Sequence, residues 1–161
     1  MKRKDRVHKP APVMAPRTRT ILYALAAVVA VAGLAEATYL TASHLAGANI
    51  VCIASAGCSQ VLGSSYAVFR GVPLAAMGAL AYFAAFSSAT LAAFGFRRAP
   101  AVLGVVVGGM FLITLWLLYV QAFVLHAFCD YCLLSAALIF TLTGIVIAVP
   151  PDRSGGNAAS N

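Results

Sequence analysis

The sequence predicts an all-α integral membrane protein, a bundle of four transmembrane helices with an interfacial loop helix that caps a pocket. Three observations lead to this fold class. Hydrophobic residues make up 62% of the 161-residue chain and charged residues only 9%, whereas soluble domains carry about 25% charged residues. Four apolar segments reach the roughly 20 residues that a membrane-spanning helix needs. Most basic residues lie before the first of these segments, between the second and third, or after the fourth. One membrane domain is expected at this length.

The four expected spans cover residues 21–42, 72–96, 101–125 and 129–149. The second opens with Pro73, near the first turn, where a missing N–H costs least. Two arginines and Pro100 separate the second span from the third, and two prolines from Pro150 end the fourth.

The spans divide the chain into three parts. Residues 1–19 are expected to form a disordered basic tail, residues 20–149 the membrane domain, and residues 150–161 a second disordered tail. A signal peptide is the alternative for the first apolar segment. It is disfavoured because the run is long, carries Glu36 and lacks a clear cleavage site.

Lysine and arginine set the expected orientation. Seven of the eleven precede residue 20: Lys2, Arg3, Lys4, Arg6, Lys9, Arg17 and Arg19. Arg97, Arg98 and Arg153 fall on the same side of a four-span layout, and only Arg70 falls on the other. The positive-inside rule therefore places both termini in the cytoplasm of a cell's inner or plasma membrane. This placement favours a topology signal and contact with anionic lipids over nucleic-acid binding.

The four cysteines form two pairs. Cys52 and Cys58 have five residues between them, and Cys129 and Cys132 form a C-x-x-C motif, a spacing that lowers a thiol pKa. The layout places both pairs on the outer face, where disulfides persist. The loop of residues 43–71 that carries the first pair is apolar, and its Ser-Gln-Val-Leu stretch after Cys58 predicts a short helix over the bundle.

These positions indicate a relay of electrons. Cys129 lies at the expected start of a helix, where the partial positive charge favours a thiolate. Cys132 lies one turn further in, at a depth that suits an apolar electron acceptor such as a quinone. Cys52 can be reached by a soluble protein. Electrons would then pass from an outside protein to Cys52 and Cys58, on to the second pair, and finally to the acceptor, by thiol–disulfide exchange between the pairs.

Three other interpretations stay open at this point. Both pairs can be static disulfides in a non-enzymatic membrane scaffold. All four thiolates can bind one tetrahedral zinc, although the apolar outer loop disfavours it, and no metal site is expected. A transmembrane reductant conduit would need a cysteine on the inner side, and the layout has none. Haem attachment would need a histidine after the motif, where Leu133 stands.

Taken together, the motifs resemble those of the bacterial vitamin K epoxide reductase family. They are Cys52, residues 58–67, the Gly-Val-Pro-Leu-Ala entry to the second span at residues 71–75 with Gly78, and Phe-Cys-Asp-Tyr-Cys at residues 128–132. The resemblance covers about residues 20–149. It is specific because these features occur in combination.

The resemblance implies a four-helix bundle that encloses a quinone beneath the loop helix. It implies that Cys52 meets a thioredoxin-like partner, Cys58 shuttles electrons to Cys129, and Cys132 lies against the quinone. Ser64 matches the family's serine beside the quinone. Bacterial relatives oxidise a periplasmic or extracellular thioredoxin-fold protein that makes disulfides. No such domain is fused here, so a separate partner is expected. Menaquinone, ubiquinone and phylloquinone stay open as the quinone, and so does activity on vitamin K epoxide.

Other residues of the spans are weaker candidates. Tyr82, Phe83, Met110 and Phe111 are interpreted as core residues, some of which should line any quinone pocket. Glu36 is either functional, as an ionisable group in a span, or a residue that reaches the interface.

His126 lies within a turn of Cys129 if the helix is continuous there, and it either assists thiolate formation or is an interfacial residue. An ionised Asp130 beside Cys129 would oppose the thiolate. Gln121, Tyr119 and Trp116 are interpreted as packing or interface residues.

Overall fold

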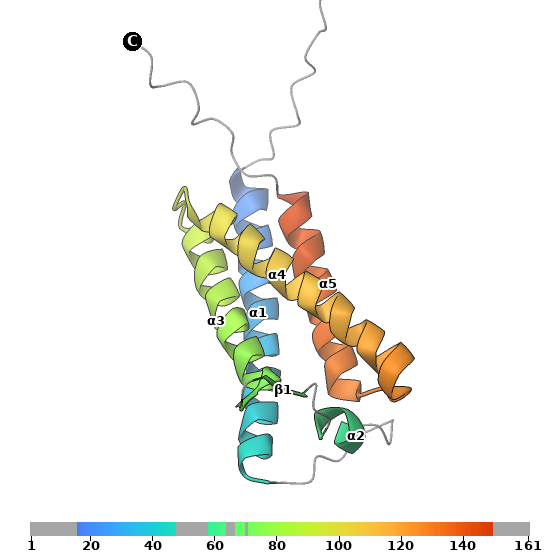
Figure 1. The fold of residues 1–161 in the computed structure, drawn as a ribbon. Coiled ribbons are helices and arrows are strands. Elements are labelled where there is room, and N and C mark those ends of the chain that lie inside the picture. The colour runs from blue at the N-terminus through green and yellow to red at the C-terminus, as the bar shows by residue number, and fades with distance from the viewer. Residues whose placement is uncertain (1–15, 48–57, 64–66, 70, 150–161) are drawn as a thin grey trace, which may run out of the picture.

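The computed structural model describes residues 16–47, 58–63, 67–69 and 71–149. In chain order its elements are α1 (Pro16–Leu45), α2 (Cys58–Leu62), β1 (Val68–Phe69), β2 (Val72–Pro73), α3 (Leu74–Ala93), α4 (Ala99–Tyr119), the π-helix η2 (Val120–Leu125) and α5 (Asp130–Ala148). Four helices in this part of the chain are long and apolar enough to cross a membrane, with η2 continuing α4. The prediction of four spans is therefore confirmed, and a short helix, α2, is present in the first loop (Figure 1).

The helix bounds differ from the predicted spans in ways that have physical causes. Helix α1 starts at Pro16 and ends at Leu45, because a helix can continue past the apolar run that crosses the hydrocarbon. Its first turn includes the last residues of the predicted basic tail. Helix α3 starts two residues later than predicted, because Val72 and Pro73 pair with β1 in a small antiparallel ribbon. It ends early because Gly95 adopts a left-handed φ of 86°.

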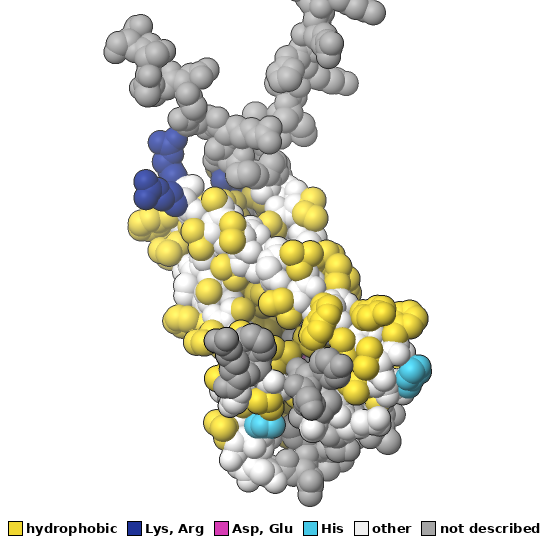
Figure 2. All heavy atoms as spheres, in the orientation of Figure 1, with side chains coloured by type: hydrophobic (Ala, Val, Ile, Leu, Met, Phe, Trp, Pro, Cys, Tyr) yellow, Lys and Arg dark blue, Asp and Glu magenta, His cyan; other side chains and the backbone are white. Residues whose placement is uncertain are grey.

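The four long helices form one bundle with two chemically different ends (Figure 1). At one end lie Arg17 and Arg19 of α1 and the join between α3 and α4, which carries Arg97 and Arg98. We call this the basic end. The other end holds α2 and the start of α5 at Cys129, and we call it the thiol end. On the face that Figure 2 shows, the described Lys and Arg side chains lie at the first end and the described His side chains at the second.

Helices α1 and α3 make the most extensive helix pair in the bundle. Small residues on both helices let their backbones approach closely. The buried positions of α1 recur at three- and four-residue spacing: Tyr23, Ala26, Ala30, Gly33, Ala37 and Leu40. On α3, Ala85 and Ala89 are fully buried. Gly33 lies directly under the Tyr82 ring, so a Cβ there would overlap the ring atoms.

The outer surface of the bundle matches a lipid environment. Large apolar side chains are exposed along every long helix, among them Leu80, Val105, Leu112 and Ile147, and Figure 2 shows apolar side chains over the visible face of the bundle. Serine and threonine hydroxyls in the spans donate to carbonyl oxygens four residues earlier, as Thr38 does to Leu34 at 2.7 Å. This arrangement satisfies polar groups where no water is available.

Candidate functional site

The start of α5 places Cys129 at the centre of the thiol end. Helix α5 begins at Asp130, and Cys129 is its N-cap residue with extended backbone angles, φ −110° and ψ 120°. The Cys129 carbonyl accepts the Leu133 N–H at 3.0 Å, the first hydrogen bond of the helix. The side chain of Cys129 is 0% exposed. The predicted position at a helix start is therefore correct to within one residue.

The chain reaches Cys129 through the π-helix η2. Such helices are rare in proteins, and those that occur are often found at functional sites. His126 ends it in the left-handed region, with φ 48° and ψ 33°. The carbonyl of Gln121 accepts the Ala127 N–H at 3.2 Å and so closes this turn. The helix is thus not continuous from His126 to Cys129, and the His126 side chain is exposed. Its predicted position within a turn of Cys129 depended on a continuous helix and is wrong.

Gln121 makes a contact that the sequence interpretation missed. Its side chain is 3% exposed, and its Oε1 accepts the backbone N–H of Cys129 at 3.3 Å. The same side chain hydrogen-bonds with the Cys132 thiol. Gln121 therefore fixes both cysteines of the motif and is more than the packing residue it was interpreted to be. The available signal was an amide side chain inside an apolar span, where polar groups are expensive.

The environment of Cys129 favours its thiolate. Hydrogen bonding from the Cys132 thiol is the largest cause that lowers the pKa of Cys129 to about 7. Burial opposes this shift, while the backbone N–H groups of Cys132 and Tyr131 add to it. The Cys129 side chain makes no N-cap hydrogen bond with the first turn of α5. Its pKa is instead lowered by the thiol and N–H groups near its sulfur. The Asp130 carboxylate raises this pKa, as its predicted charge implies.

Helix α2 brings Cys58 to the second cysteine pair. Cys58 and Val61 form one buried apolar cluster with Ala127 and Cys129. The Gln60 amide donates to the Leu125 carbonyl at 3.4 Å and ties α2 to the end of η2. Cys58 is disulfide-bonded, whereas Cys129 and Cys132 are free thiols. Cys52 lies outside the described residues.

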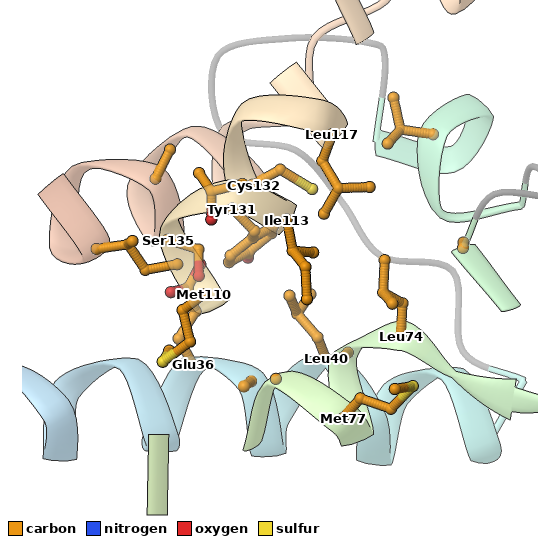
Figure 3. A pocket seen from close by; sticks show the side chains of 18 of the residues that line it. Glu36, Leu40, Leu74, Met77, Met110, Ile113, Leu117, Tyr131, Cys132 and Ser135 are labelled. Carbon is orange, nitrogen blue, oxygen red and sulfur yellow. The ribbon is translucent and has the colours of Figure 1, made fainter. Parts of the chain in front are cut away.

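A cavity of about 340 Å³ lies beside Cys132 at the thiol end. Figure 3 shows its labelled side chains converging from several helices, with Glu36 from α1 and Cys132 and Ser135 from α5. Most of the lining is apolar, including Leu40, Leu74, Met77, Ile113 and Leu117. Val61 lines it too, so α2 forms part of its wall.

The cavity also has a few polar side chains, among them Tyr82, Thr114 and Gln121. The Tyr82 hydroxyl is 2.9 Å from Ser135 Oγ and donates to the Ser135 carbonyl at 3.2 Å. An apolar cavity with a few placed polar groups is the usual form of a small-molecule site.

The residues suggested for the pocket separate into two groups. Cys132, Tyr82 and Met110 line the cavity. Phe83 and Phe111 do not, because each follows a lining residue and is turned about 100° away on its helix. The Phe83 side chain is 56% exposed, and Phe111 packs edge-on against Phe140 with centroids 5.6 Å apart.

Two further parts of the sequence analysis, Ser64 and metal binding, need comment. Ser64 falls outside the described residues. Within the described ranges no three His, Cys, Asp or Glu residues are grouped to hold a metal ion.

Comparison with protein-family models supplies the identification. The model described as "Vitamin K epoxide reductase family" matches residues 24–147. The chain belongs to the vitamin K epoxide reductase family. The match spans all four long helices and all four cysteines. The protein is accordingly a multi-pass membrane oxidoreductase that acts on thiols and disulfides. Its family uses quinones and works with thioredoxin-like partners.

Proposed function

We propose that the protein reoxidises a secreted thioredoxin-fold protein and passes the electrons through its two cysteine pairs to a membrane quinone, and so supports disulfide bond formation. The observation that carries the proposal is the position of Cys129. On one side it shares a buried cluster with Cys58. On the other it is hydrogen-bonded to Cys132, which lines the apolar cavity. This arrangement supports a path from α2 to the cavity.

Each transfer between the pairs is a thiol–disulfide exchange. The Cys58 thiolate attacks Cys129 of an oxidised Cys129–Cys132 pair, and Cys132 leaves as the thiolate. Cys52 then attacks Cys58, which restores the first disulfide and releases Cys129. A bonded Cys58 together with free Cys129 and Cys132 matches the state that follows this exchange. The lowered pKa makes Cys129 the better leaving group in this second step.

The residues around the cavity fit a quinone. Their surface is mainly apolar, as a ring with a hydrocarbon tail requires, and the buried carboxyl of Glu36 offers a polar partner. Cys132, Tyr82 and Met110 would hold the ring, and we assign Ser64 to the same site from its family motif. When bound, a quinone supplies an acceptor for two electrons and two protons.

The orientation belongs to the same proposal. The described arginines lie at the basic end, whereas Cys58, Cys129 and Cys132 lie at the opposite end. By the positive-inside rule the basic end faces the cytoplasm. The thiol end then faces the outside, where a secreted partner is available as a separate protein.

Trapping a disulfide between Cys58 and Cys129 tests the electron path most directly. The double variant Cys52→Ala/Cys132→Ala leaves Cys58 and Cys129 with only each other, and a disulfide between them should accumulate in air. In the matched control, Cys52→Ala/Cys129→Ala, Cys58 is left with Cys132, and much less crosslink is expected. Peptide mapping measures both. Free thiols in the first variant would favour two static disulfides in a scaffold.

A second experiment concerns the acceptor. The purified protein should carry a quinone that solvent extraction and mass spectrometry identify, and the reduced protein should pass electrons to it. A preparation with no quinone, and with thiols that added quinone leaves reduced, would contradict this part of the proposal.

A further inference from the structure

Glu36 is a buried carboxyl that the proposed function uses only as a polar partner for the quinone, with no part in the transfer of protons. It lies on α1 and lines the same cavity as Cys132 and Tyr82, and Figure 3 shows it with Cys132 among the lining side chains. Both carboxyl oxygens are buried, and neither has a hydrogen-bond partner among the described residues. A buried carboxyl without a partner is costly, and an ionisable group in a span is a functional candidate by default. The missing partner is therefore expected to be a molecule in the cavity.

The neighbouring polar groups are already engaged. The Tyr82 hydroxyl interacts with Ser135 on α5, and the Gln121 side-chain oxygen accepts the Cys129 N–H. Glu36 thus brings to the cavity a carboxyl that no described neighbour occupies. Among the described residues it is also the only Asp or Glu that lines the cavity. A carboxyl of this kind is a suitable group for general acid catalysis, which requires a proton within hydrogen-bonding reach of the reacting atom.

We propose that Glu36 is the proton donor of the cavity: its carboxyl hydrogen-bonds to a carbonyl oxygen of the bound quinone and delivers a proton there. This role rests on the proposed function. When Cys129 and Cys132 join in a disulfide they release two electrons and two protons, and the two carbonyl groups of the acceptor become hydroxyl groups. Glu36 gives up its proton to one oxygen and regains one of the protons that the thiols lose, so it is not consumed.

The kinetic test uses the full-length protein in detergent with menadione as the probe. After reduction of the thiols, the rate at which menadione oxidises Cys129 and Cys132 is measured in a single turnover. Glu36→Gln keeps a hydrogen-bonding side chain but has no acidic proton, and the rate should fall about 100-fold. Menadione affinity, measured by equilibrium dialysis, should change only about threefold. Glu36→Asp keeps a carboxylic acid and should recover part of the rate. If the Gln variant does not fold, the Asp variant takes its place in the test.

An infrared difference spectrum gives a readout that does not depend on turnover. Menadione binding should shift the C=O stretching band of a protonated carboxyl, and Glu36→Gln should abolish that signal. Asp130→Asn is the matched control, because Asp130 lies in the first turn of α5 and does not line the cavity. The band should persist in that variant.

The outcomes separate the two proposals. A wild-type rate in Glu36→Gln, or a carboxyl signal that survives this substitution, would overturn the role of Glu36 alone. If menadione leaves the wild-type thiols reduced, the proposed function fails. The infrared signal then decides whether Glu36 contacts the ligand.

Discussion

The basic end and the thiol end of the bundle are built from different side chains. Toward the basic end, the helices meet through small or apolar residues such as Ala26, Ala30, Leu103 and Leu142, each at most 1% exposed. At the thiol end the helices surround a cavity that contains Glu36, Gln121 and Cys132. Helix α4 packs against both α3 and α5 and joins the two regions (Figure 1). The packing that stabilises the bundle is thus displaced along its axis from the polar groups that can perform chemistry.

The largest effect is expected from removing the thiol that faces the cavity. Cys132→Ala deletes one sulfur from a partly exposed position, so the apolar core stays intact and the thermal midpoint should be unchanged. Quinone reduction should fall by at least about 1,000-fold, since no second thiol remains to form the disulfide. Steady-state kinetics measure the loss of quinone reduction, and a melting curve in detergent measures the thermal midpoint. Persistent reduction at the wild-type rate would exclude the assigned role.

A substitution in the packed seam between α1 and α3 should affect stability more than chemistry. Gly33→Ala places a methyl group against the Tyr82 ring, which is 1% exposed and held by Ser135. Overpacking of this kind costs about 1–3 kcal/mol. Gly108→Ala is the control, because open space surrounds that position, and the change should stay within about 1 kcal/mol. Equal unfolding free energies for the two variants would mean that the seam is loosely packed.

Two glutamines at the thiol end allow a comparison within that region. Gln121→Leu leaves the buried Cys129 N–H without its acceptor and should cost about 1–3 kcal/mol of unfolding free energy. Gln60 is exposed and makes only a 3.4 Å hydrogen bond to Leu125, so Gln60→Leu should change stability by less than about 0.5 kcal/mol. Denaturant titration in mixed micelles measures both. A smaller loss for Gln121 than for Gln60 would contradict its assigned contact.

The smallest predicted effect is a shift in pH dependence. Ionisation of the Cys129 thiol should be half complete near pH 7, the value to which its pKa is lowered. Asp130→Asn removes a charge that raises this pKa, so the midpoint should fall. Cys132→Ala removes the main cause of the lowering, so the midpoint should rise. The ultraviolet absorbance of the thiolate, measured against pH, gives all three midpoints without a reagent that must reach the buried sulfur. A midpoint that neither variant moves would rule out this electrostatic origin.

The same pKa affects stability with a definite sign. The folded thiol releases its proton more readily than the unfolded one, so folding gains stability above the unfolded pKa. That gain is lost as the pH falls through about 7. Unfolding free energies measured between pH 6 and about pH 9 should therefore rise with pH, and they should rise less in Cys132→Ala.

Hydropathy and residue spacing were sufficient to predict the four spans and the helix start beside Cys129. Both depend on local composition, because an apolar segment long enough to cross a membrane has to form a helix to satisfy its backbone hydrogen bonds. The contact of Gln121 with Cys129 was not predictable in this way. It depends on the π-helical turn and on the left-handed His126, which arise where the chain reverses between α4 and α5 and carry no clear sequence signature. For the same reason Phe83 could not be separated from Tyr82 before the helix faces were known.

The length of α1 has a consequence for how the protein sits in a bilayer. Its 30 residues give a rod of about 45 Å, whereas α3 and α5, with 20 and 19 residues, reach only about 30 Å, the thickness of the hydrocarbon layer. Figure 1 shows the surplus of α1 projecting past α3 at the thiol end. In a bilayer, the last turns of α1 and the short helix α2 are therefore expected at the level of the lipid headgroups. A thinner or thicker membrane is expected to change the tilt of the bundle, whereas the distance from Cys129 to the cavity is set by packing within the protein and should stay the same.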